Sequence, residues 1–163
     1  MFGERQDNKA FIPRIINKLL QNEVVQIHSK YIDGQWFPGV RSYLHAYNQA
    51  DALVFIINNV VPKLYLNEMD KPEKFNIAGN YEASNLELVL LIANILGIKD
   101  KKVFEYVDSN IVRPGHDLKY SIDGSKLHKL GWEPPLKFYD SLNQTVNWSI
   151  NNREWLSTLN IKW

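Results

Sequence analysis

The sequence contains no cysteine, which excludes a disulfide framework and a metal site built on thiolates. It also lacks an excess of charge of one sign, because 19 lysines and arginines nearly balance 18 aspartates and glutamates. Such a chain has no overall field that would draw it to nucleic acid or to an anionic membrane. An anionic ligand must therefore be held by a local group of basic side chains.

Long hydrophobic runs are missing as well. The longest apolar segment, residues 86–98, is interrupted by polar side chains and is too short to cross a bilayer. The amino end shows no signal-peptide pattern, so we expect a cytoplasmic protein. A length of 163 residues, of which 45% are hydrophobic, suits one core, and we expect residues 1–163 to form a single region.

Helical and strand patterns alternate along the chain, which predicts an α/β fold of an α+β-like kind with about five helices. The strongest helix pattern opens with Ser84 and Glu87 at capping-box spacing and ends at Gly97. Asn48 is expected to cap an earlier helix, and residues 30–40 are expected to form a loop. The other predicted helices begin at Phe11 or cover 48–59, 125–130 and 138–151, and the predicted strands cover 24–29, 41–46, 74–80 and 102–107.

The segment Arg113–His116 is predicted to form a type II turn, because proline suits its second position and glycine tolerates the positive φ of its third. The first and last residues of such a turn approach within about 7 Å, so Arg113 and His116 would converge. An arginine fork beside an imidazole suits phosphate oxygens. The alternative is a surface turn in which Arg113 pairs with Asp117 or with another nearby carboxylate.

The order of the motifs resembles the carboxy-terminal half of nucleotide-sugar 4,6-dehydratases of the extended short-chain dehydrogenase/reductase group, most closely dTDP-glucose 4,6-dehydratases. The motifs are FIP, VVQIHS, GVRSYLHAYNQADAL, FNIAGNYEASNLELV, RPGHDLKYSIDGSKL, LGWEPP and SLNQTVNW, and together they cover almost the whole chain. The resemblance implies the substrate-binding part of such a fold, without the main Rossmann sheet. The full-length family converts dTDP-glucose to dTDP-4-keto-6-deoxyglucose.

The resemblance also implies a ligand and residues that hold it. The ligand would be a dTDP-sugar or a UDP-sugar. Arg113 and Arg41 would grip its diphosphate or the neighbouring ribose, with His116 beside them, and Asn76 would hydrogen-bond the nucleotide. The base pocket would be lined by Gln26, Ile27 and His28 and closed by Phe11 and Ile12.

Each of these assignments has a structural alternative. Arg41 could belong to an ordinary ion pair, and Asn76 could merely end a strand. His28 could be a hydrogen-bonded structural histidine within an apolar strand. Phe11 and Ile12 could serve the core alone.

The catalytic parts of the resembled family are missing from the sequence. None of the eight tyrosines has lysine four positions later, and neither an Asp-Glu dipeptide nor a Gly-x-x-Gly-x-x-Gly or Gly-x-Gly-x-x-Gly motif occurs. We therefore expect no catalytic residue and no cofactor in this chain, whereas the resemblance implies NAD for the full-length family. The four histidines are scattered, so no metal site is expected either.

Three functions remain open. The first is the nucleotide-sugar binding part of a dehydratase-like enzyme, inactive alone or working with a separate Rossmann-domain polypeptide. The second is a fragment of a UDP-sugar epimerase or decarboxylase, and the third is a non-catalytic nucleotide-sugar binding or assembly module. The RPGHD motif favours the first. In the resembled family the segments 48–59 and 74–80 contribute to the junction with the Rossmann sheet, so this chain is expected to expose apolar surface there.

Overall fold

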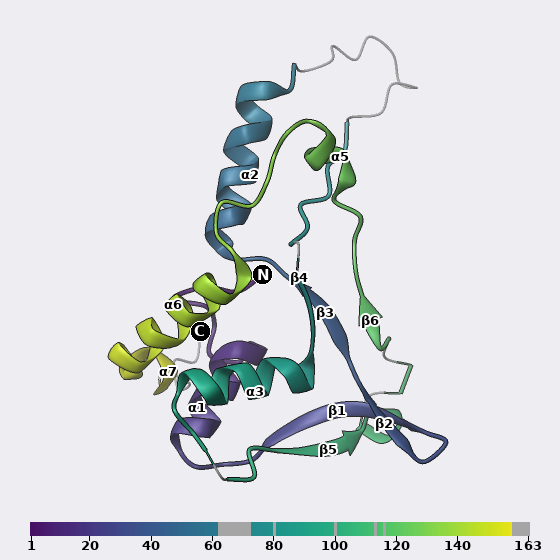
Figure 1. The fold of residues 1–163 in the computed structure, drawn as a ribbon, viewed down its shortest axis with the longest axis vertical. Coiled ribbons are helices and arrows are strands. Elements are labelled where there is room, and N and C mark those ends of the chain that lie inside the picture. Colours follow the sequence, from purple (N-terminus) through teal and green to yellow (C-terminus); the bar gives the residue numbers. More distant parts are fainter. Residues whose placement is uncertain (62–72, 80, 100, 113, 116, 158–163) are drawn as a thin grey trace, which may run out of the picture.

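The structure is a computed structural model, and it describes residues 1–61, 73–79, 81–99, 101–112, 114–115 and 117–157. Figure 1 shows a broad lower body, made of helices beside a sheet, from which an arm containing α2 and α5 rises. No helix in the described part of the chain is long and apolar enough to cross a membrane. The predicted α/β class is confirmed, with small mixed sheets and more helices than expected.

The lower body contains the main hydrophobic core. Its sheet has the strand order β2-β1-β5, in which β1 pairs antiparallel with β2 and parallel with β5. The strands are β1 (Val25–Ile32), β2 (Gln35–Pro38) and β5 (Phe104–Asp108). The helices that share this core are α1 (Phe11–Leu20), α3 (Asn85–Ile95), α6 (Phe138–Asn151) and the short α7 (Arg153–Ser157).

Local sequence signals account well for these helices. The Ser84 hydroxyl accepts a hydrogen bond from the Glu87 backbone N–H at 3.0 Å, as the predicted cap requires. Gly97 has φ of 70°, the left-handed conformation in which glycine commonly follows a helix. The predicted limits of the last long helix, 138–151, coincide with α6.

The loop expected at residues 30–40 is wrong, because most of this segment forms a hairpin of β1 and β2. Asp33 and Gly34 connect the strands with φ of 47° and 83°, and Asp-Gly is a favoured pair for a two-residue hairpin turn. Tyr31 and Trp36 face each other across the strands with ring centroids 4.8 Å apart. This cross-strand contact between the rings stabilises a hairpin where a loop was expected.

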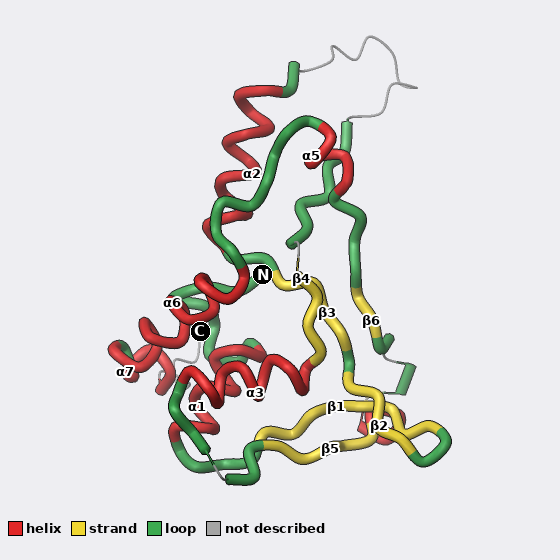
Figure 2. The backbone as a smooth tube through the Cα atoms, viewed as in Figure 1, coloured by secondary structure: helices red, strands yellow, loops and turns green. Residues whose placement is uncertain are grey.

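A second sheet connects the lower body to the arm, as the yellow strands in Figure 2 show. It has the order β4-β3-β6, with β3 antiparallel to β4 and parallel to β6. Its strands are β3 (Val40–Tyr43), β4 (Tyr81–Ser84) and β6 (Lys119–Tyr120).

The strand expected at 74–80 is also wrong, since residues 73–79 are irregular and pairing with β3 begins at Tyr81. A Cβ at Gly79 would lie 1.9 Å from the Tyr43 carbonyl oxygen, so only glycine allows the chain to pass this close. Phe75 and Ile77 instead pack on a small second core in the arm. The apolar residues of this segment thus reflect packing on that core, and they do not indicate pairing with a neighbouring strand.

The arm is built on α2 (Ala46–Asn59) and α5 (Ser125–Lys129). His45 caps α2 by accepting a hydrogen bond from the Tyr47 backbone N–H, so the expected cap at Asn48 is wrong. Asn48 is buried and bonds Leu136 instead. The buried core of the arm consists of Leu44, Ala52, Leu127 and Trp132.

Candidate functional site

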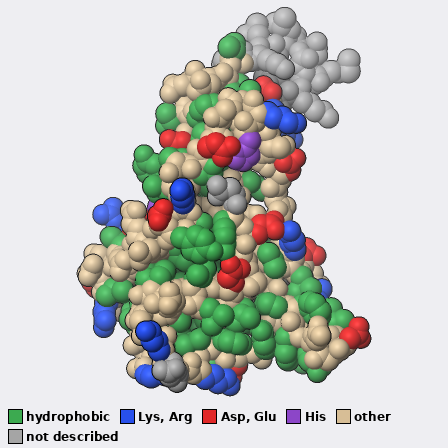
Figure 3. All heavy atoms as spheres, viewed as in Figure 1, with side chains coloured by type: hydrophobic (Ala, Val, Ile, Leu, Met, Phe, Trp, Pro, Cys, Tyr) green, Lys and Arg blue, Asp and Glu red, His purple; other side chains and the backbone are tan. Residues whose placement is uncertain are grey.

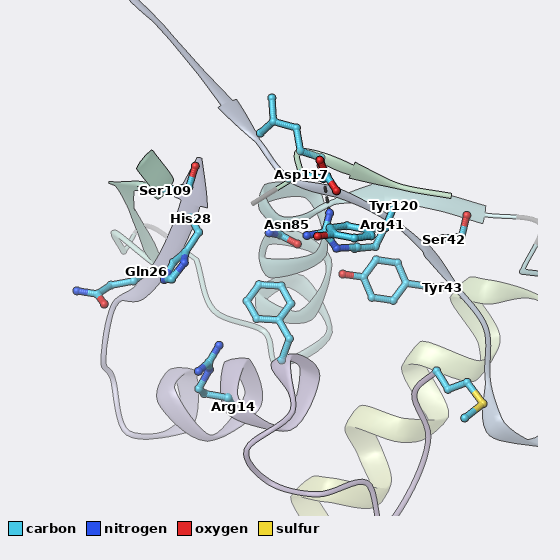
Figure 4. A pocket seen from close by; sticks show the side chains of 14 residues that line it. Arg14, Gln26, His28, Arg41, Ser42, Tyr43, Asn85, Ser109, Asp117 and Tyr120 are labelled. Atoms are coloured by element: carbon cyan, nitrogen blue, oxygen red, sulfur yellow. Dashed lines mark hydrogen bonds between the residues drawn. The ribbon is translucent and has the colours of Figure 1, made fainter. Parts of the chain in front are cut away.

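A cavity of about 470 Å³ lies where α1, β1 and β3 meet β6 and the start of α3. Four of the residues singled out from the sequence line it, namely Phe11, Gln26, His28 and Arg41. Figure 4 shows that Arg41, Tyr43, Tyr120 and Asn85 gather at one end, whereas Arg14, Gln26 and His28 lie at the other.

Alternation along β1 decides which of its side chains reach the cavity. Gln26 and His28 point to one face of the strand, and Ile27, which is fully buried in the main core, points to the other. The same core takes Ile12, which is 2% exposed, although its neighbour Phe11 lines the cavity.

Asn76 lies apart from this group. Its side-chain amide donates a hydrogen bond to the Asp123 carbonyl oxygen at 3.0 Å, and it is not among the lining residues. Arg113 and His116 lie outside the described residues. Between them, Gly115 has φ of 77°, the conformation that the third position of a type II turn requires.

Arg41 is held by both backbone and side-chain contacts. Its Nη1 donates to the Val40 carbonyl oxygen at 2.7 Å and to the Leu118 carbonyl oxygen at 3.1 Å. Its guanidinium carbon lies 4.1 Å from the centroid of the Tyr120 ring, which is a cation–π contact. These contacts fix a positive charge at the cavity wall before any ligand arrives.

Gly39 makes the close packing beside Arg41 possible. A Cβ at this position would lie 3.2 Å from Asn85 Nδ2 and 3.5 Å from Arg41 Nη1. A larger residue would therefore push into the side chains that line this end of the cavity.

Tyr43 adds a neutral polar group to the same end. Burial raises the pKa of the Tyr43 hydroxyl to about 12, against an opposing effect of the Arg41 charge. The hydroxyl therefore stays protonated at neutral pH and can donate a hydrogen bond to an anionic oxygen.

Sequence reasoning assigned no ligand to Arg14, Tyr43, Asn85, Asp117 or Tyr120, although all of them line the cavity. Asn85 follows the capping Ser84 and was interpreted only as a helix start. Tyr120 lies in β6, shortly after the predicted turn, and its aromatic ring close to a predicted anion site was the one signal available. No group of three or more metal-ligating side chains occurs within the described ranges.

Comparison with solved structures defines the class of the protein as part of the extended short-chain dehydrogenase/reductase fold. The dTDP-glucose 4,6-dehydratase of Bacillus anthracis, solved with NAD, matches with a TM-score of 0.70 and 31% identity over 94% of this chain and 43% of that chain. The Streptomyces venezuelae enzyme DesIV, also a dTDP-glucose 4,6-dehydratase solved with NAD, matches with a TM-score of 0.72 and 29% identity over 94% of this chain and 42% of that one.

Residues 2–145 match the family model for GDP-mannose 4,6 dehydratase, and the chain belongs to this family. A dTDP-glucose 4,6-dehydratase of Escherichia coli is 31% identical over 165 residues, covering 94% of this chain and 41% of that protein. The enzyme of the same name from Xanthomonas campestris is 32% identical, covering 95% of this chain and 42% of that protein. The chain thus spans about two fifths of the length of these relatives.

Proposed function

We propose that this chain binds a dTDP-sugar or a UDP-sugar in the cavity, as the substrate-binding part of a dTDP-glucose 4,6-dehydratase-like enzyme. Its relatives at 31 and 32% identity are dTDP-glucose 4,6-dehydratases, which supports a dehydratase over an epimerase. A UDP-glucose 4-epimerase of Thermotoga maritima, solved with UDP-glucose, is only 23% identical and supports the fold alone.

The observation that carries this proposal is the fixed position of Arg41. A guanidinium stacked on Tyr120 and bonded to the Leu118 carbonyl has lost much of its side-chain freedom in advance. Less conformational entropy is then lost when a ligand binds. Arginine matches the paired oxygens of a diphosphate, and the Phe11 and His28 rings on the cavity wall suit a planar base.

We propose further that the chain neither binds NAD nor transfers hydride by itself. It contains no Tyr-x-x-x-Lys pair and no glycine-rich turn of the kind that holds the pyrophosphate of NAD. A Rossmann polypeptide would supply both the cofactor and the catalytic residues.

The surface for that Rossmann polypeptide would be the outer face of α2. Leu53, Val54 and Ile57 are 49%, 55% and 77% exposed there, and Figure 3 shows hydrophobic side chains along this helix. Apolar groups gathered on one exposed helix face are typical of an interaction surface.

Calorimetric titration of the chain with dTDP-glucose, UDP-glucose and NAD tests the proposal. At least one sugar nucleotide is expected to bind. Arg41→Ala is expected to weaken that binding by about 10- to 100-fold, because the ligand loses its charge-assisted hydrogen bonds to the guanidinium. Arg153→Ala, at an exposed arginine of α7 outside the cavity, is the control and should keep the wild-type affinity.

Two results would contradict the proposal. Binding of NAD alone would mean that the chain is not the substrate part of the enzyme. Failure of both sugar nucleotides to bind would leave the assembly module as the better interpretation.

A further inference from the structure

The cavity has a second guanidinium, at the end away from Arg41. Arg14 extends from α1 towards the side of the cavity where Gln26 and His28 lie (Figure 4). Its guanidinium carbon is 6.0 Å from the centroid of the Phe11 ring, one helical turn earlier. A positive donor group and an aromatic ring therefore share this end of the cavity.

The groups around Arg14 leave its donors available for a ligand. Among the described residues, no aspartate or glutamate lies within ion-pair distance of Arg14. Gln26 donates its amide N–H to the Glu105 carboxylate at 3.2 Å, so the amide is held to the neighbouring strand. Arg14 is thus the strongest hydrogen-bond donor described at this end.

We propose that Arg14 determines which nucleobase the cavity accepts, a proposal that rests on the proposed function. Arg41 lies where the diphosphate would bind, so the base of the same ligand would reach the end that holds Arg14. Phe11 lies beside Arg14 there. Arginine carries five N–H donors and no acceptor. It therefore pairs with an acceptor on the edge of the base, and in this proposal that acceptor is the C4 carbonyl oxygen.

The same chemistry disfavours an amino group at that position. Uracil and thymine present the O4 carbonyl oxygen where cytosine presents an N4 amino group. An amino group facing a guanidinium sets donor against donor, and both groups lose the hydrogen bonds that water gave them. Arg14 would therefore select uracil and thymine against cytosine.

UDP and CDP form a matched pair for the test, because their bases differ only at C4, which carries a carbonyl oxygen in uracil and an amino group in cytosine, and at N3, which is a donor in uracil and an acceptor in cytosine. Calorimetry on the full chain is expected to give UDP an affinity about tenfold higher than that of CDP, a typical discrimination for one good base contact. In Arg14→Leu this ratio should fall below about threefold, mainly through weaker binding of UDP. Arg14→Lys keeps the charge without the fork, and its ratio should lie between the two.

The controls separate this inference from the proposed function. Arg153→Leu should keep the wild-type ratio, and thermal melting should show that each variant remains folded. Equal binding of UDP and CDP by the wild-type chain would overturn the role of Arg14 and leave the proposed function standing. An equal loss of both ligands in Arg14→Leu would overturn it as well, because the residue would then act only through its charge. Failure of UDP, CDP and pyrophosphate to bind would overturn both.

Discussion

Tyr43 connects the ionisation of one side chain to the stability of the fold. Its folded pKa of about 12 lies above the ordinary tyrosine value of 10.0 because burial disfavours the phenolate. The folded state therefore holds this proton more tightly than the unfolded state does. The resulting stabilisation is fully present below pH 10 and is lost as the pH rises through 12.

Replacing Tyr43 with phenylalanine should remove this alkaline loss. Two pKa units correspond to about 2–3 kcal/mol. Between pH 9 and 12 the free energy of unfolding should therefore fall in both proteins, and the fall should be larger by about that amount in the wild type than in Tyr43→Phe. Urea unfolding at a series of pH values measures the difference. Tyr47→Phe, at an exposed tyrosine of α2, is the control, and parallel curves for wild type and Tyr43→Phe would contradict the argument.

At the scale of elements, α2 is fixed to the segment before α6 by a buried asparagine. Asn48 donates to the Leu136 carbonyl oxygen at 2.9 Å and accepts from the Leu136 N–H at 3.0 Å. One turn along the helix, Asp51 accepts a hydrogen bond from the indole N–H of Trp132 at 2.8 Å. Side chains of α2 thus satisfy polar groups of a loop far away in the sequence.

Asn48→Ala should lower the free energy of unfolding by about 2–4 kcal/mol, because it leaves both backbone groups of Leu136 without their partners. Asn48→Asp keeps the acceptor and loses the donor, so its free energy of unfolding should lie between those of the wild type and Asn48→Ala. Asn58→Ala, at an exposed position of the same helix, should change stability by less than about 0.5 kcal/mol. Urea unfolding near neutral pH decides the matter, and an Asn48→Ala chain as stable as Asn58→Ala would disprove the role of this pair of bonds.

These contacts also explain which elements the sequence could predict. The cap at Ser84 and the stop at Gly97 are local signals, and both have the expected conformation. The role of Asn48 depends on a residue 88 positions away, so its place before a helical pattern suggested a cap instead. The site divides in the same way: the motifs indicated Arg41 and His28, whereas Arg14 joins them only through the packing of α1 beside β1.

At the scale of the whole molecule, the two hydrophobic cores differ greatly in size. The core cluster of the lower body contains most of the buried apolar side chains, whereas the core cluster of the arm has only Leu44, Ala52, Leu127 and Trp132 as its buried members among the described residues. The inner face of α2 packs on this small core, and its outer face carries Leu53, Val54 and Ile57, which are exposed in the described part of the chain. The arm therefore combines the smaller core with an exposed apolar helix face.

The outer face of α2 should make the chain self-associate when no partner covers it. Leu53→Lys combined with Ile57→Lys should shift the chain towards monomer in sedimentation velocity, since two charges oppose burial of that face. Ile122→Lys, at a 53% exposed isoleucine elsewhere, should leave self-association as in the wild type. A wild-type chain that stays monomeric at all concentrations and melts cooperatively would contradict this prediction. It would favour an independent module, because no surface of α2 would then require a Rossmann polypeptide.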